Sequence, residues 1–99
     1  MKIVAVTACP TGIAHTYMAA ARLEKTAKDL GHEIKVETQG ALGIETRLSE
    51  ADIRQAQAVI FAVAIGIEGR ERFRGMQVIE VPLQEALMNT RGIFTRIQS

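Results

Sequence analysis

Two short apolar runs place the strongest constraint on the fold of this chain. Lys2–Thr7 (KIVAVT) and Ala58–Val63 (AVIFAV) are almost wholly apolar and rich in β-branched residues. This composition is typical of strands that are buried on both faces of a sheet. Sheets of that kind are mostly parallel and carry helices on each face, so the two runs predict an α/β architecture.

The segment between the two runs predicts one long helix, one strand and one short helix. The long helix is indicated by apolar residues at spacings of three and four, which are Ala20, Leu23, Ala27 and Leu30. Residues 32–38 (HEIKVET) alternate apolar and charged side chains, as in a half-exposed edge strand. Gly40 and Gly43 indicate a loop. Ser49 and Asp52 have the spacing of a capping box, which predicts a short helix ending near Gln57.

The last third of the chain continues the alternation. A polar loop is expected at 66–75, with or without a helical turn. A short fourth strand is indicated by Val78, Ile79 and Val81. After Pro82 a single final helix is indicated by Leu83, Leu87, Phe94 and Ile97. The whole pattern predicts a three-layer α/β/α sandwich around a four-stranded, mainly parallel open sheet, of the Rossmann-like or flavodoxin-like kind.

Composition argues against several functions. The 12 Lys and Arg residues nearly balance the 11 Asp and Glu residues, and only four aromatic residues (one Tyr, three Phe) are present, which disfavours nucleic-acid binding. The longest apolar run, Ala58–Ile67, is about half the ~20 residues that a membrane-spanning helix needs. The apolar run before Pro10 is too short for a signal peptide. We expect a cytosolic domain with no direct membrane insertion.

Cys9 is the only cysteine, and it lies in the stretch Val6–Thr16 (VTACPTGIAHT) between the first strand and the first helix. A lone cysteine is most often a small buried apolar residue, but a packing role would suit a position inside the strand better than one in a loop. In open α/β sheets, ligands bind beyond the carboxyl ends of the strands. A helix N-terminus there also stabilises a thiolate. The position therefore favours a chemically active sulfur.

The loop after Cys9 has the features of an anion-binding loop. Gly12 lets the backbone approach a ligand closely, and the amides and hydroxyls of Thr11–Thr16 are potential donors. An ordinary strand-to-helix turn with Thr16 as the N-cap is the alternative. The lysine of a Walker P-loop and a G-x-G-x-x-G sequence are both absent, which disfavours a nucleotide.

A comparison with cysteine-dependent phosphatases indicates whether the loop is suited to carrying a phosphoryl group or to hydrolysing it. Those enzymes place an arginine six residues after the cysteine, whereas this chain has His15 there. An imidazole binds or releases an anion as it titrates near neutral pH. The loop is therefore predicted to hold a phosphoryl group on sulfur and to activate water poorly. A phosphatase-like hydrolase and a non-catalytic regulatory domain of the same fold remain as alternatives.

Several stretches resemble one known family. Val4–Thr16, followed by Met18–Ala20, closely resembles the start of the fructose-type enzyme IIB component of the bacterial phosphoenolpyruvate-dependent sugar phosphotransferase system (PTS). Val36–Gly40 (VETQG) and Glu71–Phe73 (ERF) also resemble that family. The resemblance covers essentially the whole chain and implies a single IIB domain at residues 1–99.

The resemblance implies a phosphotransferase that works through a phosphocysteine. Cys9 would accept a phosphoryl group from a phosphohistidine of enzyme IIA and donate it to a fructose or fructose-like sugar held by the membrane enzyme IIC. Such a protein is cytoplasmic and associates with the inner face of the membrane through IIC. No metal or cofactor is implied. The phosphate-binding loop would comprise Pro10, Thr11, Gly12, Ile13, Ala14, His15 and Thr16.

Other residues are interpreted from their positions. Many members of the family carry an Asp near Ala64, which this chain lacks, and the difference is expected to affect the sugar and partner contacts rather than Cys9. His15 is either a phosphate ligand or a scaffold residue. Gln39–Gly40 either borders the site or forms a plain turn. His32 is predicted to be an exposed turn residue, and Arg70–Arg74 either a solvated segment or a docking surface for an acidic partner.

Overall fold

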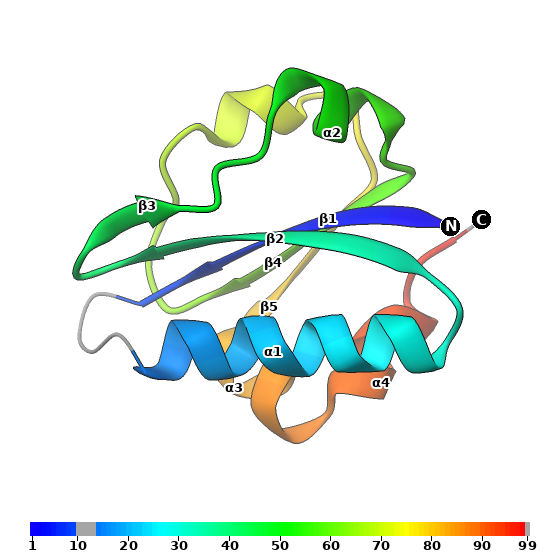
Figure 1. The fold of residues 1–99 in the computed structure, drawn as a ribbon, viewed down its shortest axis with the longest axis horizontal. Helices are drawn as coiled ribbons and strands as arrows, with labels where there is room; N and C mark the ends of the chain where they lie inside the picture. Colours follow the sequence, from blue (N-terminus) through cyan, green and yellow to red (C-terminus); the bar gives the residue numbers. More distant parts are fainter. Residues whose placement is uncertain (10–13, 99) are drawn as a thin grey trace.

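A five-stranded sheet forms the middle layer of the computed structural model, which describes residues 1–9 and 14–98 (Figure 1). The strands are β1 (Lys2–Ala8), β2 (Glu33–Gly40), β3 (Gly43–Glu45), β4 (Ala58–Val63) and β5 (Val78–Pro82). The helices are α1 (Ala14–Asp29), α2 (Glu50–Gln55), α3 (Leu83–Met88) and α4 (Thr90–Thr95), with a short 3₁₀ helix, η1 (Arg70–Phe73).

The strand order is β3-β2-β1-β4-β5, and all neighbours are parallel except the antiparallel pair β2–β3. The chain passes from β1 to β2 on one side and later to β4 on the other side. The order therefore reverses at β1, and the carboxyl ends of β1 and β4 form the switch point where such sheets bind ligands. The mainly parallel sheet predicted from the sequence is confirmed.

The predicted number of strands was wrong by one. Gly40 and Gly43 were interpreted as loop, but they pair with each other and flank a tight turn between β2 and β3. Gly43 has φ of +88°, which favours glycine at this turn. Because β3 pairs only with residues 38–40, the first half of β2 still lies at an edge, as the alternating pattern predicted.

Helices cover both faces of the sheet, as predicted (Figure 1). α1, α3 and α4 lie on one face, and α2 and the yellow η1 lie on the other. Alternate residues of β1 enter two separate apolar clusters: Ile3 and Ala5 face α1, while Val4 and Val6 face Ile53 of α2. In the part of the chain that the structure describes, no helix is long and apolar enough to span a membrane.

The predicted final helix is interrupted. α3 ends at Met88 and α4 begins at Thr90, with Asn89 between them at φ −141° and ψ 53°. Asn89 has a low helix propensity, and it is the residue that leaves the helical conformation at the break. The apolar residues still reach the core because Leu83 and Phe94 are both buried against the α1 side of the sheet. In the 66–75 segment, η1 supplies the helical turn that the sequence left open.

The capping box at the start of α2 is confirmed. The Ser49 hydroxyl accepts from the Asp52 N–H at 3.0 Å, and the Asp52 carboxylate accepts from the Ser49 N–H at 2.9 Å. The Ser49 N–H, an ion pair with Lys35 at 3.1 Å and the Ser49 hydroxyl lower the pKa of Asp52 to about 2. Asp52 therefore stays ionised down to strongly acidic pH.

We expect Ser49→Ala to lower the free energy of unfolding by about 1 kcal/mol, the usual effect of losing an N-cap. Urea denaturation followed by circular dichroism measures it. Gln84→Ala on the exposed surface of α3 is the control, because it removes no cap. An unchanged midpoint in Ser49→Ala would show that the box does not stabilise α2.

Candidate functional site at the carboxyl edge of the sheet

Cys9 directly follows β1 at the switch point of the sheet. Its N–H donates to the carbonyl of Gln39 at 3.2 Å, and the Ala64 N–H donates to the carbonyl of Ala8 at 2.9 Å. These bonds extend the β1–β2 and β1–β4 ladders by one step each. The backbone of Cys9 is therefore held between the ends of β2 and β4, and the residue is 5% exposed. The predicted position of Cys9 beyond the first strand is confirmed.

The first turn of α1 lies beside Cys9. The Thr7 hydroxyl donates to the carbonyl of Thr16 at 3.2 Å, which ties the end of β1 to this turn. Thr16 is buried, and a Cβ added at Gly40 would lie 3.4 Å from its hydroxyl oxygen. Thr16 belongs to the helix itself, since α1 begins at Ala14, so the N-cap interpretation of Thr16 is wrong.

The predicted phosphate-binding loop falls partly outside the described residues. Pro10, Thr11, Gly12 and Ile13 lie there, and the structure describes the last three residues of the loop, Ala14, His15 and Thr16. At the far end, Ala14 and His15 are exposed in the first turn of α1. The N–H groups of a first helical turn point away from the helix body, here toward the carboxyl edge of the sheet. The helix dipole adds partial positive charge at the same end.

A buried carboxylate on β2 is the main feature of this end of the sheet that the sequence did not reveal. Glu37 of β2 is 0% exposed, and its two oxygens accept hydrogen bonds from Arg72 at 2.9 and 3.0 Å. The carboxylate also accepts hydrogen bonds from the Gln39 amide nitrogen at 2.7 Å and from the Leu48 N–H at 2.9 Å. Burial alone would raise the pKa of Glu37, but these hydrogen bonds outweigh it and hold the pKa below its usual value.

Gln39 connects this carboxylate to the loop that follows β4. Its amide nitrogen also donates to the carbonyl of Glu68 at 3.0 Å, and its amide oxygen accepts from the Glu68 N–H at 2.9 Å. The backbone carbonyl of Gln39 accepts from Cys9. Gln39 thus borders Cys9, and Gly40 lies against Thr16 of the first turn of α1, which agrees with one of the two interpretations left open.

The solvated interpretation of Arg70–Arg74 was wrong for its middle residues. Arg72 is largely buried by its pairing with Glu37, and Phe73 belongs to the α2-side core. Arg70 forms an ion pair with Glu80 and lies over the Phe61 ring, with 4.9 Å from its guanidinium carbon to the ring centroid. The sequence offered one signal, the polar side chains of Glu37 and Gln39 at alternate strand positions, but it could not show that Arg72 lies opposite them.

His32 also differs from its prediction. The ring is half-buried and stacks on Phe94, with centroids 6.1 Å apart and an interplanar angle of 16°. Gly31, at φ +80°, turns the chain back so that the His32 N–H donates to the carbonyl of Ala27 at 2.8 Å. This turn lies at the end of α1 opposite to Cys9, so His32 takes no part in the candidate site.

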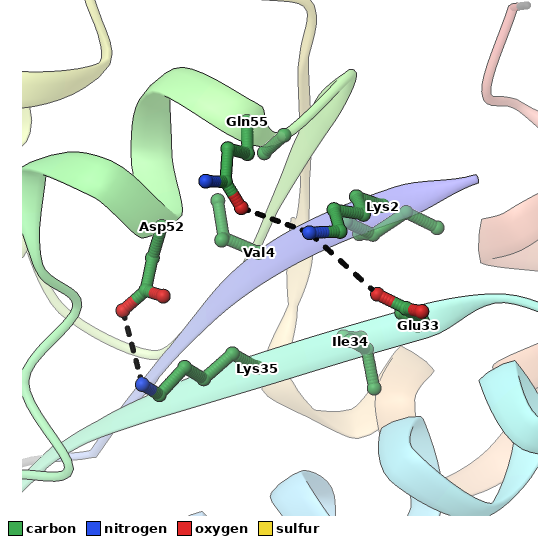
Figure 2. Close-up of a pocket in the computed structure, with 9 residues that line it drawn as sticks. Lys2, Val4, Glu33, Ile34, Lys35, Asp52 and Gln55 are labelled. Atoms are coloured by element: carbon green, nitrogen blue, oxygen red, sulfur yellow. Dashed lines mark hydrogen bonds and ion pairs between the residues drawn. The ribbon is translucent and has the colours of Figure 1, made fainter.

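A groove of about 230 Å³ lies between α2 and the first halves of β1 and β2 (Figure 2). Its charged side chains neutralise one another: Lys35 pairs with Asp52 at 3.1 Å, and Lys2 pairs with Glu33 at 3.9 Å. The groove lies toward the amino ends of the strands, away from Cys9. It is therefore separate from the candidate site.

Large apolar side chains are exposed around the carboxyl edge. They belong to the first turns of α1, the β2–β3 turn and the segment after β4, and they are Tyr17, Met18, Leu42 and Ile65. We call these four residues the apolar rim. The Tyr17 hydroxyl donates to the Glu45 carboxylate, which raises the pKa of Tyr17 and joins α1 to β3. Exposed apolar side chains gathered at one edge of a domain are typical of a surface that binds another protein.

The fold and the site define a small parallel α/β domain with a single cysteine at its switch point. A family model described as the lactose/cellobiose-specific IIB subunit of the PTS matches residues 4–96. The fructose-like EIIB component 1 of Escherichia coli K12 is 47% identical over 97 residues, covering 98% of this chain and 90% of that protein. A solved domain of the fructose-specific IIABC component of Borrelia burgdorferi has a TM-score of 0.90 at 49% identity, covering 94% of this chain and 88% of that one.

A third relative is the fructose-like PTS EIIBC component of E. coli K12, which is 50% identical over 99 residues, covering 98% of this chain and 20% of that protein. The chain therefore belongs to the IIB subunit family of the phosphotransferase system, and its role lies in PTS sugar phosphotransfer. The resemblance drawn from the CPTGIAHT, VETQG and ERF stretches is confirmed.

Proposed function

We propose that Cys9 carries the phosphoryl group, taking it from a phosphohistidine of enzyme IIA and giving it to a sugar held by membrane enzyme IIC. The observation that carries this proposal is the placement of the single cysteine at the switch point, beside the first turn of α1. In this scheme residues 1–99 act as one cytoplasmic IIB domain that meets the membrane only through IIC.

The transfer takes place in two displacements on phosphorus. In the first, the Cys9 thiolate attacks, an S–P bond forms, the P–N bond breaks and the leaving imidazole nitrogen takes up a proton. In the second, a sugar hydroxyl attacks, an O–P bond forms, the S–P bond breaks and the hydroxyl proton is lost to a base. Because the transition state is loose, positioning and donors to the phosphoryl oxygens provide most of the catalysis. We assign the donors to the loop Pro10–Thr16.

The apolar rim is the surface proposed to receive the partner proteins. Its residues lie on the elements that start or end at the carboxyl edge, where Cys9 lies, so a donor docked there would present its phosphohistidine to the sulfur, and IIC would present the sugar to the same place. The relative named EIIBC, which is far longer than this chain, supports IIC as a partner. The relatives named fructose-like support a fructose-like sugar. The absence of an acid at Ala64, whose N–H contacts the β1 end, is proposed to affect that specificity.

Intact mass after incubation with phosphoenolpyruvate, the general phosphocarrier proteins and a fructose-type IIA tests the proposal. We expect a gain of one phosphoryl group that prior alkylation of Cys9 prevents. A phosphatase-like hydrolase would instead turn over p-nitrophenyl phosphate and release inorganic phosphate. A non-catalytic regulatory domain would gain no phosphoryl group at all.

His15→Ala tests whether the imidazole binds the phosphoryl group. His15 is exposed in the first turn of α1. If its ring donates to a phosphoryl oxygen, we expect phosphorylation by IIA to slow by about 10-fold or more, as with the loss of one oxyanion donor. Lys28→Ala at the other end of α1 is the control. Equal rates in His15→Ala and the control would make His15 a scaffold residue.

A further inference from the structure

We propose that Glu37, Gln39 and Arg72 are positioning residues for phosphoryl transfer. They hold the backbone of Cys9 and the segment at 64–69 in one fixed arrangement across the carboxyl end of β1. This proposal rests on the proposed function, because it assigns these three side chains to the site at which Cys9 accepts the phosphoryl group. None of the three touches the reacting atoms in this scheme.

The Glu37–Arg72 pair provides the fixed point. Both oxygens of Glu37 are saturated by donors, and the guanidinium also donates to the carbonyls of Gly69 at 2.7 Å and Glu68 at 3.2 Å. A buried ion pair of this kind adds little net stability, since the loss of hydration offsets most of the attraction. Its main effect is to fix the orientation of η1 relative to β2, because a bidentate arginine–carboxylate pair allows only one relative orientation of the two groups. We therefore interpret it as a device that fixes the η1 end of the segment relative to β2.

Gln39 transmits this orientation to the site. An ionised carboxylate only accepts hydrogen bonds, so Glu37 requires the nitrogen of the Gln39 amide to face it at 2.7 Å. The amide oxygen then faces the Glu68 N–H, and both bonds to the Glu68 backbone form. The main chain of the same residue accepts from Cys9. One residue thus joins the buried ion pair, the segment after β4 and the backbone of the proposed nucleophile.

The 64–69 segment is consequently tied at both ends around β1. At its start, the Ala64 N–H donates to the carbonyl of Ala8, immediately before Cys9. At its end, Glu68 is bonded to Gln39 and Arg72. Because β1 lies between β2 and β4, the segment passes across the carboxyl end of β1. A shift of this segment or of the β2 end would move the backbone that carries the sulfur.

Glu37→Gln is the sharpest test because it keeps the shape of the side chain while it removes the charge that pairs with Arg72 and replaces one acceptor oxygen by an N–H₂ donor. In one orientation the new N–H₂ group faces the Gln39 amide nitrogen, and turning the Gln39 amide to accept from it would set the Gln39 nitrogen against the Glu68 N–H. In the other orientation the N–H₂ group faces two donors, Arg72 and the Leu48 N–H. The first orientation breaks the bonds between Gln39 and Glu68, and the second breaks the fixed point at Arg72. Gln39→Met removes the same link while leaving Arg72 and Leu48 on Glu37. This second variant decides the question if Glu37→Gln does not fold.

The experiment measures single-turnover transfer from a phosphorylated fructose-type IIA, together with amide hydrogen exchange. For both variants we expect the maximal rate to fall about 10- to 100-fold, in line with the cost of misplacing reacting groups by about 1 Å. The half-saturating concentration of the donor should stay within about twofold, since the apolar rim is unchanged. Exchange at the Cys9 and Glu68 amides should become faster. Glu80→Gln, which removes the exposed partner of Arg70, is the matched control and should change none of these values.

Three results would overturn the proposal: unchanged rate and exchange in a folded Gln39→Met variant, a loss of rate that only follows the unfolded fraction, or an equal loss in Glu80→Gln. Failure of the unsubstituted chain to accept a phosphoryl group is a different outcome. It would overturn the proposed function, and the exchange data would then show separately whether the three side chains order the carboxyl edge.

Discussion

Cys9→Ser is expected to accept no phosphoryl group from phosphorylated IIA, while its fold remains intact. A serine hydroxyl is not ionised near neutral pH and is a far weaker nucleophile than a thiolate, so the first displacement should not occur at a measurable rate. Intact mass spectrometry in the presence of phosphoenolpyruvate and the general phosphocarriers measures uptake. Circular dichroism should show a cooperative melting transition with at most a modest decrease in its midpoint, because the backbone contacts of the residue are kept while a hydroxyl replaces a thiol in the apolar core.

His32→Gln serves as the control for Cys9→Ser, because His32 stacks on Phe94 at the opposite end of α1 and lies away from the proposed site. It should retain full uptake. Full uptake by Cys9→Ser would contradict the assignment of Cys9. Loss of uptake in both variants would instead indicate a general effect of destabilisation, which the melting transitions would reveal.

Arg72→Met is expected to lower the free energy of unfolding by about 3–5 kcal/mol at neutral pH, because it leaves the Glu37 carboxylate buried without its counter-ion. Arg70→Met is the matched control on the same 3₁₀ helix. Its partner Glu80 is exposed, so the expected loss is about 1 kcal/mol or less. Urea denaturation of both variants measures the difference.

The pH dependence of Arg72→Met follows from the pKa of Glu37. In the unsubstituted protein that pKa lies below its unfolded value, so the contribution of Glu37 is present above pH ~4.3 and is lost as the pH falls through the lower folded value. Without Arg72, burial raises the pKa above the unfolded value, and the variant gains stability as the pH falls. The difference in free energy of unfolding between the unsubstituted protein and Arg72→Met should therefore become smaller as the pH falls. A difference in free energy of unfolding that stays constant from pH 7 to about pH 4 would contradict a charged Glu37.

Local patterns were sufficient for the elements that position Cys9. The two apolar β-branched runs specified β1 and β4, because a strand buried on both faces must be apolar throughout. Helical spacing specified α1, and the Ser49–Asp52 pair specified the start of α2. With strands and helices in alternation, the position of Cys9 at the carboxyl edge followed from the topology of open α/β sheets.

Long-range pairing was what the sequence could not specify. Glu37 and Arg72 are 35 residues apart, and nothing local to either residue indicates the other. The three-residue β3 contains no apolar run, and its place depends on pairing with the end of β2. The interruption at Asn89 was hidden because the apolar residues on both sides of it keep helical spacing. His32 was predicted to be exposed because its packing depends on Phe94 of α4, which is distant in the sequence.

Locating the phosphoryl group on the chain tests the central claim most directly. After incubation with phosphoenolpyruvate, the general phosphocarriers and IIA, the proposed function predicts one phosphoryl group per chain, bonded to the sulfur of Cys9. Phosphorus NMR of the intact protein distinguishes a thiophosphate from a phosphohistidine, and peptide mass mapping locates the residue. A phosphoryl group on His15 or His32, or none on any residue, would contradict the claim.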